Sequence, residues 1–336
     1  MRKAEYEKYM LHFKEAAGTS RGTLVEKETY IIRIWDDAQP EIKGTGECAL
    51  FRGLSKEDCP EYEVRLSELC RNIDRVSPEH LVEWSSLRFG VEMALADLHH
   101  GGKGIYFPSA FTAGQQAIEI NGLIWMGDRT TMLQRIEQKL VAGFRCIKLK
   151  IGAIDFESEL SLLKHIRTRF DRTQVELRVD ANGAFSPEDA LEKLEALSEF
   201  DLHSIEQPVK AGQWEVMADL CAHSPVPVAL DEELIGVTRM EDKRSLVSVI
   251  HPQYLVLKPA LCGGFAGACD WISLAQRAGI QWWVTSALES NIGLNALAQW
   301  VATLNNPMPQ GLGTGQLYTN NFPSPVIQEG SVLLYR

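Results

Sequence analysis

Apolar and polar positions follow one pattern near the amino terminus and a different pattern beyond it. Residues 4–14, 24–35 and the segment from Gly44 have the composition of strands separated by turn-rich segments, which predicts an antiparallel meander. Helical periodicity follows over residues 57–75 and 78–99. Strands followed by helices are typical of an α+β domain.

Composition changes at residues 101–114, which are rich in glycine and proline and predict a domain boundary. We therefore place an α+β domain at residues 1–107. Strand-like runs then alternate with helical stretches over residues 108–314, ending at a short strand at 311–314, and this alternation predicts a parallel α/β barrel. We expect the tail, residues 315–336, to pack back onto the first domain. A length of 336 residues is enough for one barrel of about 250 residues and a smaller domain.

Charged residues stand at the ends of the strand-like runs in the middle of the barrel. They recur about every 25 to 30 residues, the length of one strand plus one crossover helix. In a parallel barrel, the carboxyl ends of the strands meet at one mouth, where active sites lie. We therefore expect these side chains to converge. They are Lys148 and Lys150 in CIKLKIG, Asp180 in VELRVDAN, Glu206 in SIEQP, Asp231 in VALDEE and Lys258 in YLVLKPA.

The carboxylates of Asp180, Glu206 and Asp231 predict a metal site. Ligands that are all oxygen suit Mg²⁺, with Mn²⁺ as the second choice, whereas zinc prefers histidine or cysteine. Lys148 and Lys150 are two positions apart on a strand and should point to the same face. Each of these residues alone is typical of an ordinary loop, but together they favour an active site.

Overall composition narrows the possible partners. A net charge of −11 argues against a nucleic-acid or anionic-membrane partner, because both select basic surfaces. The amino terminus lacks the apolar core of a signal peptide, and no apolar run approaches the length of a membrane span. Seven cysteines without a CxxC pair predict no disulfide framework and favour the cytoplasm. The oligomeric state is left open.

The charged positions resemble those of the enolase superfamily and, within it, the muconate-lactonizing type of subgroup. The match consists of the KxK at Lys148 and Lys150, the three carboxylates, and Lys258. Segments across nearly the whole chain, including 88–98, 286–300 and 311–318, resemble the o-succinylbenzoate synthase family. The resemblance implies a modified TIM barrel of the (β/α)7β type, closed by the α+β domain acting as a cap.

The resemblance also implies a reaction in menaquinone biosynthesis. A small carboxylic acid, 2-succinyl-6-hydroxy-2,4-cyclohexadiene-1-carboxylate, would lose water to give 2-succinylbenzoate through an enediolate. Carried over by position, the three carboxylates would hold the metal and Lys150 would be the base and then the acid. Lys148 and Lys258 would support the reaction through their charges.

Three further residues are candidates for substrate binding. Asn182 follows Asp180 on the same face, although an Asn-Gly turn is an equally good interpretation. Arg21 stands in the first turn of the cap and could meet a substrate carboxylate, or it could simply be exposed. Ser286 belongs to the SALESNIG segment that resembles the family.

Two alternatives remain at this point. An N-acylamino-acid racemase or a muconate-type cycloisomerase would use the same machinery, and a racemase needs paired bases such as Lys150 and Lys258. A barrel that only binds its ligand is disfavoured because so many convergent charges are costly to keep. The segment WVTSALES has no histidine, and GLGTGQ lacks the two aspartates of the dipeptide epimerases. Both absences favour the o-succinylbenzoate synthase interpretation.

Overall fold

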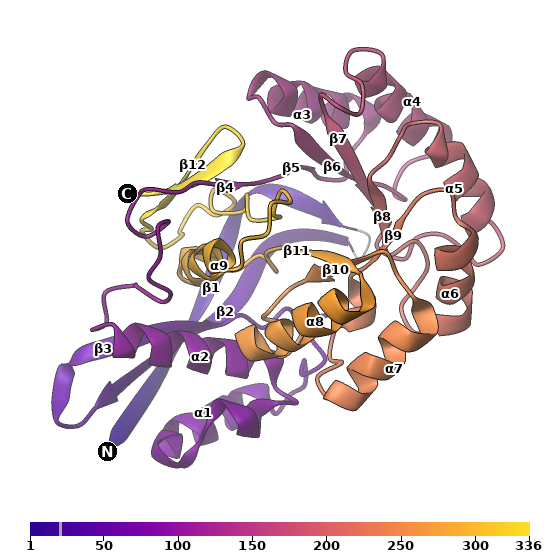
Figure 1. The fold of residues 1–336 in the computed structure, drawn as a ribbon. Helices are drawn as coiled ribbons and strands as arrows, with labels where there is room; N and C mark the ends of the chain where they lie inside the picture. The colour runs from indigo at the N-terminus through magenta and orange to yellow at the C-terminus, as the bar shows by residue number, and fades with distance from the viewer. Residues whose placement is uncertain (20–21) are drawn as a thin grey trace.

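An antiparallel sheet and two helices form the amino-terminal part of the molecule (Figure 1). The structure, a computed structural model, describes residues 1–19 and 22–336. The strands are ordered β1-β2-β3, and β2 pairs with both neighbours. The elements are β1 (Arg2–Thr19), β2 (Gly22–Asp36), β3 (Gln39–Cys48), α1 (Tyr62–Arg71), α2 (Ser85–His99), and the 3₁₀ turns Ile73–Arg75 and Pro78–Leu81.

Glycines of β3 allow helix α2 to lie directly against the sheet. A Cβ atom at Gly44 would stand 2.0 Å from the carbonyl oxygen of Ala94, and one at Gly46 would stand 2.0 Å from that of Gly90. Such distances leave room for no side chain, so backbone packs on backbone. The contact fixes the cap as one unit, with its own apolar core between sheet and helices.

The helix expected over residues 78–99 is broken in the structure. A 3₁₀ turn ends at Leu81, Trp84 has a non-helical backbone (φ −123°, ψ 71°), and α2 begins at Ser85. The carboxylate of Glu57 accepts a hydrogen bond of 2.7 Å from the backbone N–H of Ser86. The first N–H groups of a helix have no partner within it, and Glu57 supplies one from a distant segment. This contact favours a helix start at Ser85.

Seven parallel strands form the barrel sheet in the order β5-β6-β7-β8-β9-β10-β11, and helices cover its outer face (Figure 1). This is the α/β barrel with an antiparallel cap that the sequence predicts, and the prediction is confirmed. The strands are β5 (Gly122–Ile124), β6 (Cys146–Lys150), β7 (Glu176–Asp180), β8 (Ser204–Glu206), β9 (Val228–Leu230), β10 (Tyr254–Leu257) and β11 (Gln281–Val284). The helices are α3 (Arg129–Val141), α4 (Phe156–Arg167), α5 (Ala190–Ser198), α6 (Trp214–His223), α7 (Met240–Ile250), α8 (Gly264–Ala278) and α9 (Asn291–Thr303), with a 3₁₀ turn at Glu232–Leu234.

The last barrel strand, expected at residues 311–314, is reduced to isolated bridges. Gln310 bridges to Ile120 and Gly311 bridges to Thr285, and these pairs join the two edges of the sheet. A Cβ atom at Gly311 would lie 2.2 Å from Thr285 Oγ1, so only glycine permits this approach. The chain turns away directly afterwards, which leaves no regular strand.

The tail contacts two parts of the molecule. Residues 317–320 run along β1, where the Lys14 N–H donates to Leu317 O at 2.8 Å and the Thr319 N–H donates to His12 O at 2.9 Å. Strands β12 (Val326–Glu329) and β13 (Val332–Tyr335) instead form a small sheet with β4 (Ile118–Glu119). The domain boundaries proposed above remain a prediction. None of the described helices combines the length and apolar character needed to cross a bilayer.

Candidate active site

The charged residues singled out in the sequence lie at the carboxyl ends of neighbouring strands. The strand register pairs Lys150 with Asp180 and Asp180 with Glu206, so these three residues stand at one level of the sheet. Because the sheet is parallel, every such end opens at the same mouth. The full set is Lys148 and Lys150 on β6, Asp180 at the end of β7, Glu206 at the end of β8, Asp231 directly after β9, and Lys258 directly after β10.

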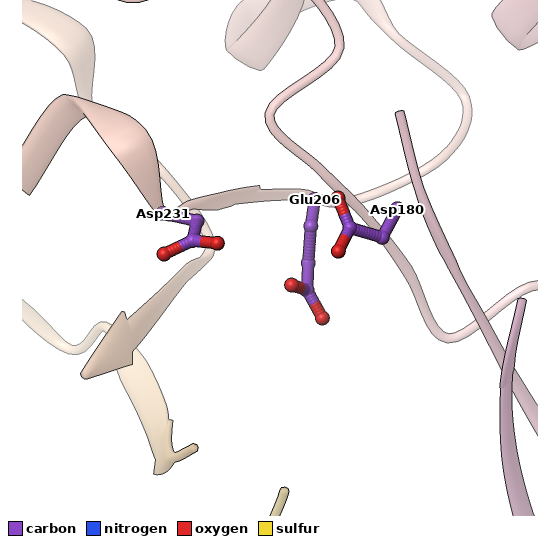
Figure 2. A group of neighbouring side chains, drawn as sticks. All are labelled: Asp180, Glu206 and Asp231. Atoms are coloured by element: carbon purple, nitrogen blue, oxygen red, sulfur yellow. The ribbon is translucent and has the colours of Figure 1, made fainter. Parts of the chain in front are cut away.

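The side chains of Asp180, Glu206 and Asp231 form a compact buried group (Figure 2). One oxygen from each lies within 4.8 Å of the others, and none of the three residues is more than 1% exposed. Among the described residues, Glu206 Oε1 and Asp231 Oδ1 have no hydrogen-bond partner. Buried carboxylate oxygens without a partner are costly unless a cation meets them. The group therefore fits a divalent metal ion with oxygen ligands.

Lysines flank this carboxylate group on both sides. Lys148 Nζ lies 2.9 Å from Asp180 Oδ2 and also contacts Glu206. Lys150 Nζ lies 3.0 Å from Asp180 Oδ2. On the other side, Lys258 Nζ lies 2.5 Å from Asp231 Oδ2. The arrangement gives a cavity with cations on two opposite sides and anions between them.

Burial and neighbouring charges set the ionisation of this group. Burial raises the pKa of Glu206 to about 7, the nearby Asp180 and Asp231 add to the effect, and Lys148 opposes it. Burial would also raise the pKa of Asp180, but the ammonium groups of Lys148 and Lys150 hold it well below its usual range. Burial would lower the pKa of Lys148, but Asp180 and Glu206 raise it instead. Lys148 is thus a permanent cation.

Asn182 connects Lys150 to the metal-site loop. Its Oδ1 accepts a hydrogen bond of 2.6 Å from Lys150 Nζ, and its Nδ2 donates to Glu232 Oε1 at 3.0 Å. The Asn182 backbone has φ +45°, a left-handed conformation that asparagine tolerates better than most residues. The structure therefore shows both features that the sequence left as alternatives, a turn and a polar contact.

The other two candidates differ in what the structure says of them. Arg21 lies outside the described residues. Ser286 lines the cavity, but its Oγ donates to Glu289 Oε2 at 2.6 Å and accepts from the Leu288 N–H at 2.9 Å. Because a hydroxyl has one proton, Ser286 is left with acceptor capacity only. Its assignment to substrate binding remains a prediction.

A cavity of about 750 Å³, counting the part open to solvent, lies over the charged group. Sequence reasoning missed several residues that line it. Thr314 ends the segment 311–314 expected as the last barrel strand, so the rule of strand ends could have found it. Asn121 directly precedes β5, and that rule does not point to it. Phe51 and Leu54 come from the cap and carry no such signal. The lining is Phe51, Leu54, Asn121, Leu123, Trp125, Lys148, Lys150, Asp180, Asn182, Lys258, Leu261, Thr285, Ser286, Ala287, Leu288, Gly311, Gly313 and Thr314.

Comparisons with known proteins agree with this architecture. The family model "Enolase C-terminal domain-like" matches residues 131–334. The chain is 46% identical to an o-succinylbenzoate synthase of Desulfotalea psychrophila, over 98% of this chain and 97% of that protein. It resembles the crystal structure of MenC from the same organism with a TM-score of 0.88 and 42% identity, covering 99% of both chains.

A more distant likeness shows the fold alone. The dipeptide epimerase of Enterococcus faecalis, solved with Mg and the dipeptide L-Leu-L-Tyr, has a TM-score of 0.82 at 19% identity, over 99% of this chain and 96% of that one. The full-length match to the Desulfotalea protein carries more weight, because it includes the cap as well as the barrel. The chain therefore belongs to the enolase superfamily and, within it, to the o-succinylbenzoate synthase family.

Proposed function

We propose that this chain is an o-succinylbenzoate synthase, a dehydratase of menaquinone biosynthesis. Its substrate is then the small carboxylic acid 2-succinyl-6-hydroxy-2,4-cyclohexadiene-1-carboxylate, and its product is 2-succinylbenzoate. The observation that carries the proposal is the buried group of Asp180, Glu206 and Asp231 between lysines, in a chain 46% identical over nearly its whole length to an o-succinylbenzoate synthase. Seven free cysteines, all within the described ranges, support a reducing compartment such as the cytoplasm.

The resident metal is proposed to be Mg²⁺, with Mn²⁺ as the alternative. Three carboxylates without nitrogen or sulfur ligands favour a hard cation, and a relative of the same fold was solved with Mg. When bound, the ion would supply positive charge to the substrate carboxylate as negative charge develops on its oxygens. Asp180, Glu206 and Asp231 would hold it.

Lys150 is proposed to remove the proton α to the carboxylate. Its Nζ is fixed by Asn182 Oδ1 and Asp180 Oδ2, so it faces the cavity from a defined position. In a syn elimination, one group on one face can take the α-proton and return it to the departing hydroxyl. Lys148, held as a cation between Asp180 and Glu206, would stabilise the enediolate through its charge.

Lys258 stands on the opposite side of the carboxylate group and is proposed to act through its charge as well. Its ammonium group lies against Asp231, whose carboxylate raises the Lys258 pKa although burial alone would lower it. Racemisation needs a base on each face, whereas a syn dehydration needs one base on one face, so a role of Lys258 through its charge accords with the proposed dehydration.

Gly311 and Gly313 give further support against a dipeptide-epimerase activity. The resemblance implies that dipeptide epimerases carry two aspartates on their last strand to hold an amino group, and the segment GLGTGQ, residues 311–316, has none. Here a side chain at Gly311 would clash with Thr285 Oγ1 at 2.2 Å. Among the described residues that line the cavity, none on this wall carries a carboxylate.

An absorbance assay tests the proposal directly. The purified protein with Mg²⁺ should aromatise the cyclohexadiene acid, and removing the metal with EDTA should abolish turnover until Mg²⁺ is restored. A protein that binds 2-succinylbenzoate but never turns over the acid would be a binding barrel. Exchange of the α-proton of an N-acylamino acid with solvent deuterium, without dehydration of the cyclohexadiene acid, would identify a racemase instead.

A further inference from the structure

Helices α8 and α9 of the barrel both lie beside the cap (Figure 1). The starts of these helices are at the mouth of the barrel, because each follows the carboxyl end of a strand. The first N–H groups of a helix have no partner within it, so a helix start is a natural place for an anion. At both of these starts, a carboxylate of the cap takes that place.

Glu92 of α2 binds the start of α8. Its Oε2 accepts hydrogen bonds from the N–H groups of Phe265 at 2.6 Å and Ala266 at 3.4 Å. A Cβ atom at Gly264 would stand 2.5 Å from the same oxygen, so the glycine lets the carboxylate reach these groups. Arg88, one turn earlier on α2, has its Nε 3.0 Å from Glu92 Oε1. Both oxygens of Glu92 are thus held.

Glu47 of β3 binds the start of α9 in the same way. It is fully buried, and it accepts hydrogen bonds from the N–H groups of Ser290 and Gly293, both at 2.9 Å. Ser290 Oγ also donates to Glu47 Oε2 at 2.6 Å. A Cβ atom at Gly293 would stand 2.8 Å from Glu47 Oε2, so a glycine again allows the approach.

The two carboxylates belong to cap elements that pack as one unit. Strand β3 and helix α2 are in backbone contact, since a Cβ atom at Gly90 would stand 2.5 Å from Cys48 Sγ and one at Gly46 would stand 2.0 Å from Gly90 O. Next to Glu92, the ring of Phe89 packs on that of Phe265, with the ring centres 4.9 Å apart. The cap therefore holds the starts of α8 and α9 at a fixed spacing.

A tight turn joins the start of α8 to a charged residue of the cavity. Lys258 O accepts from the Leu261 N–H at 2.8 Å and from the Cys262 N–H at 3.1 Å. Pro259 O accepts from the Gly264 N–H at 2.8 Å. Lys258 and Leu261 both line the cavity. Because these hydrogen bonds leave the turn little slack, a shift of the α8 start also moves Lys258.

A short segment likewise joins the start of α9 to the cavity wall. Ser286, Ala287 and Leu288 line the cavity, and Ser290 follows two residues later. Leu288 has φ +62°, a left-handed conformation that is an outlier for a bulky side chain and persists only where the surroundings impose it. By fixing Ser290, Glu47 supplies part of that constraint.

We propose that Glu47 and Glu92 are positioning residues of the active site. By docking on the starts of α9 and α8, they let the cap set the places of residues 286–288 and of Lys258. Neither is among the described residues that line the cavity, so they act without touching the substrate. The inference rests on the proposed function, since it assigns to the cap a part in the same dehydration.

Glu92→Gln tests the contact with α8. Glutamine keeps an acceptor oxygen but loses the charge, and hydrogen bonds to a neutral acceptor are roughly half as strong as those to a carboxylate. Lys258 is proposed to act on charge that develops in the transition state, so its misplacement should affect the transition state more than the bound substrate. We expect kcat to fall about tenfold with KM nearly unchanged.

Glu47→Gln tests the contact with α9, and its expected kinetic effect differs. The cavity wall contacts the substrate before and during the reaction, so loosening it should weaken ground-state binding. We expect KM to rise about five- to tenfold, equivalent to a weakened hydrogen bond or two, with kcat nearly unchanged. The Kd of the product 2-succinylbenzoate, measured by calorimetry, should rise by the same factor. A merely structural role would not divide kcat and KM between the two variants.

Hydrogen exchange follows the same coupling without a substrate. In Glu92→Gln, exchange should become faster at the N–H groups of Leu261 and Cys262, which Glu92 does not contact, as well as at Phe265 and Ala266. If Glu47→Gln fails to fold, Glu92→Gln still gives the kinetic and the exchange comparison with the wild type.

Another buried carboxylate of α2 provides the matched control. Asp97 is 1% exposed and accepts hydrogen bonds from the N–H groups of Thr45 at 2.9 Å and Gly104 at 2.7 Å, neither of which belongs to a barrel helix. Asp97→Asn should lower the melting temperature and leave kcat and KM unchanged.

The proposed function and the role of the two carboxylates fail differently. An inactive wild type would overturn the proposed function alone, because hydrogen exchange reports the coupling without turnover. An active wild type in which Glu92→Gln and Glu47→Gln change kcat and KM no more than Asp97→Asn does would overturn the positioning role. Faster exchange confined to Phe265 and Ala266 in Glu92→Gln would overturn it as well.

Discussion

Lys150 Nζ and Asn182 Oδ1 lie 2.6 Å apart, and this hydrogen bond joins the proposed base on β6 to the loop that follows the neighbouring strand β7. Asn182 in turn donates to Glu232, which follows β9. The base is therefore oriented by residues that also surround the metal site. A small polar residue can control proton transfer in this way without reacting itself.

Replacing Asn182 by alanine or glycine separates orientation from turn formation. Glycine accepts the left-handed backbone, so a residue needed only for the turn would be replaceable by it. We expect both variants to lose about tenfold or more in kcat with little change in KM, because the lost contact positions the proposed base. Full activity of Asn182→Gly, with alanine impaired, would show that only the turn matters.

The two lysines that flank the carboxylates should respond differently to substitution. Lys150→Ala removes the proposed base, and general acid–base catalysis contributes about 10² to 10⁴-fold, so activity should fall by at least that much. Lys258→Arg keeps a cation and should retain more activity than Lys258→Ala. The measurement is α-deuterium exchange and dehydration, with fold and metal binding checked for each variant. Normal exchange in Lys150→Ala, with loss of exchange in Lys258→Arg, would reverse the assigned roles.

Metal affinity should depend on pH because of Glu206. Burial raises the pKa of Glu206 to about 7 in the metal-free protein, so below this pH the group carries a proton that a metal ion must displace. Affinity for Mg²⁺ should therefore be nearly constant above pH 7 and fall by about tenfold for each pH unit below it. Calorimetric titration with Mg²⁺ at several pH values from about 5.5 to 8.5 measures this change in affinity. The two limits lie about one to two pH units on either side of the Glu206 pKa. Glu206→Gln should lose both the metal affinity and its pH dependence, and a flat profile in the wild type would contradict the assignment.

Thr314 should contribute to substrate affinity. It is 4% exposed and lines the cavity, and its Oγ1 has no hydrogen-bond partner among the described residues. The proposed substrate has a second carboxylate and a carbonyl on its succinyl chain, either of which can accept from this hydroxyl. Thr314→Val should raise KM by about three- to tenfold, the value of one hydrogen bond, and leave kcat nearly unchanged. Thr168→Val changes a residue outside the cavity and serves as the control. Equal KM values in the two variants would show that Thr314 does not contribute to substrate binding.

The sequence alone determines the alternation of strands and helices. It therefore also determines that the charged residues stand at the carboxyl ends of the strands. Lys150, Asp180 and Glu206 recur at the period of one β/α unit, and parallel strands necessarily present their carboxyl ends together. Local periodicity is enough to predict that these side chains meet. The nature of the donor atoms is likewise a property of the residues, and it predicts a hard metal ion.

Only the tertiary structure decided which atoms of distant segments contact one another. The start of α2 depends on Glu57, and the start of α9 depends on Glu47 of β3, whose carboxylate accepts a hydrogen bond from the Ser290 N–H; packing brings each carboxylate into place. Such contacts leave no periodic signal, because each forms once and its partners are separated by a variable length of chain. The reduced last strand is a similar case, since it depends on how closely Gly311 approaches Thr285 when the barrel closes.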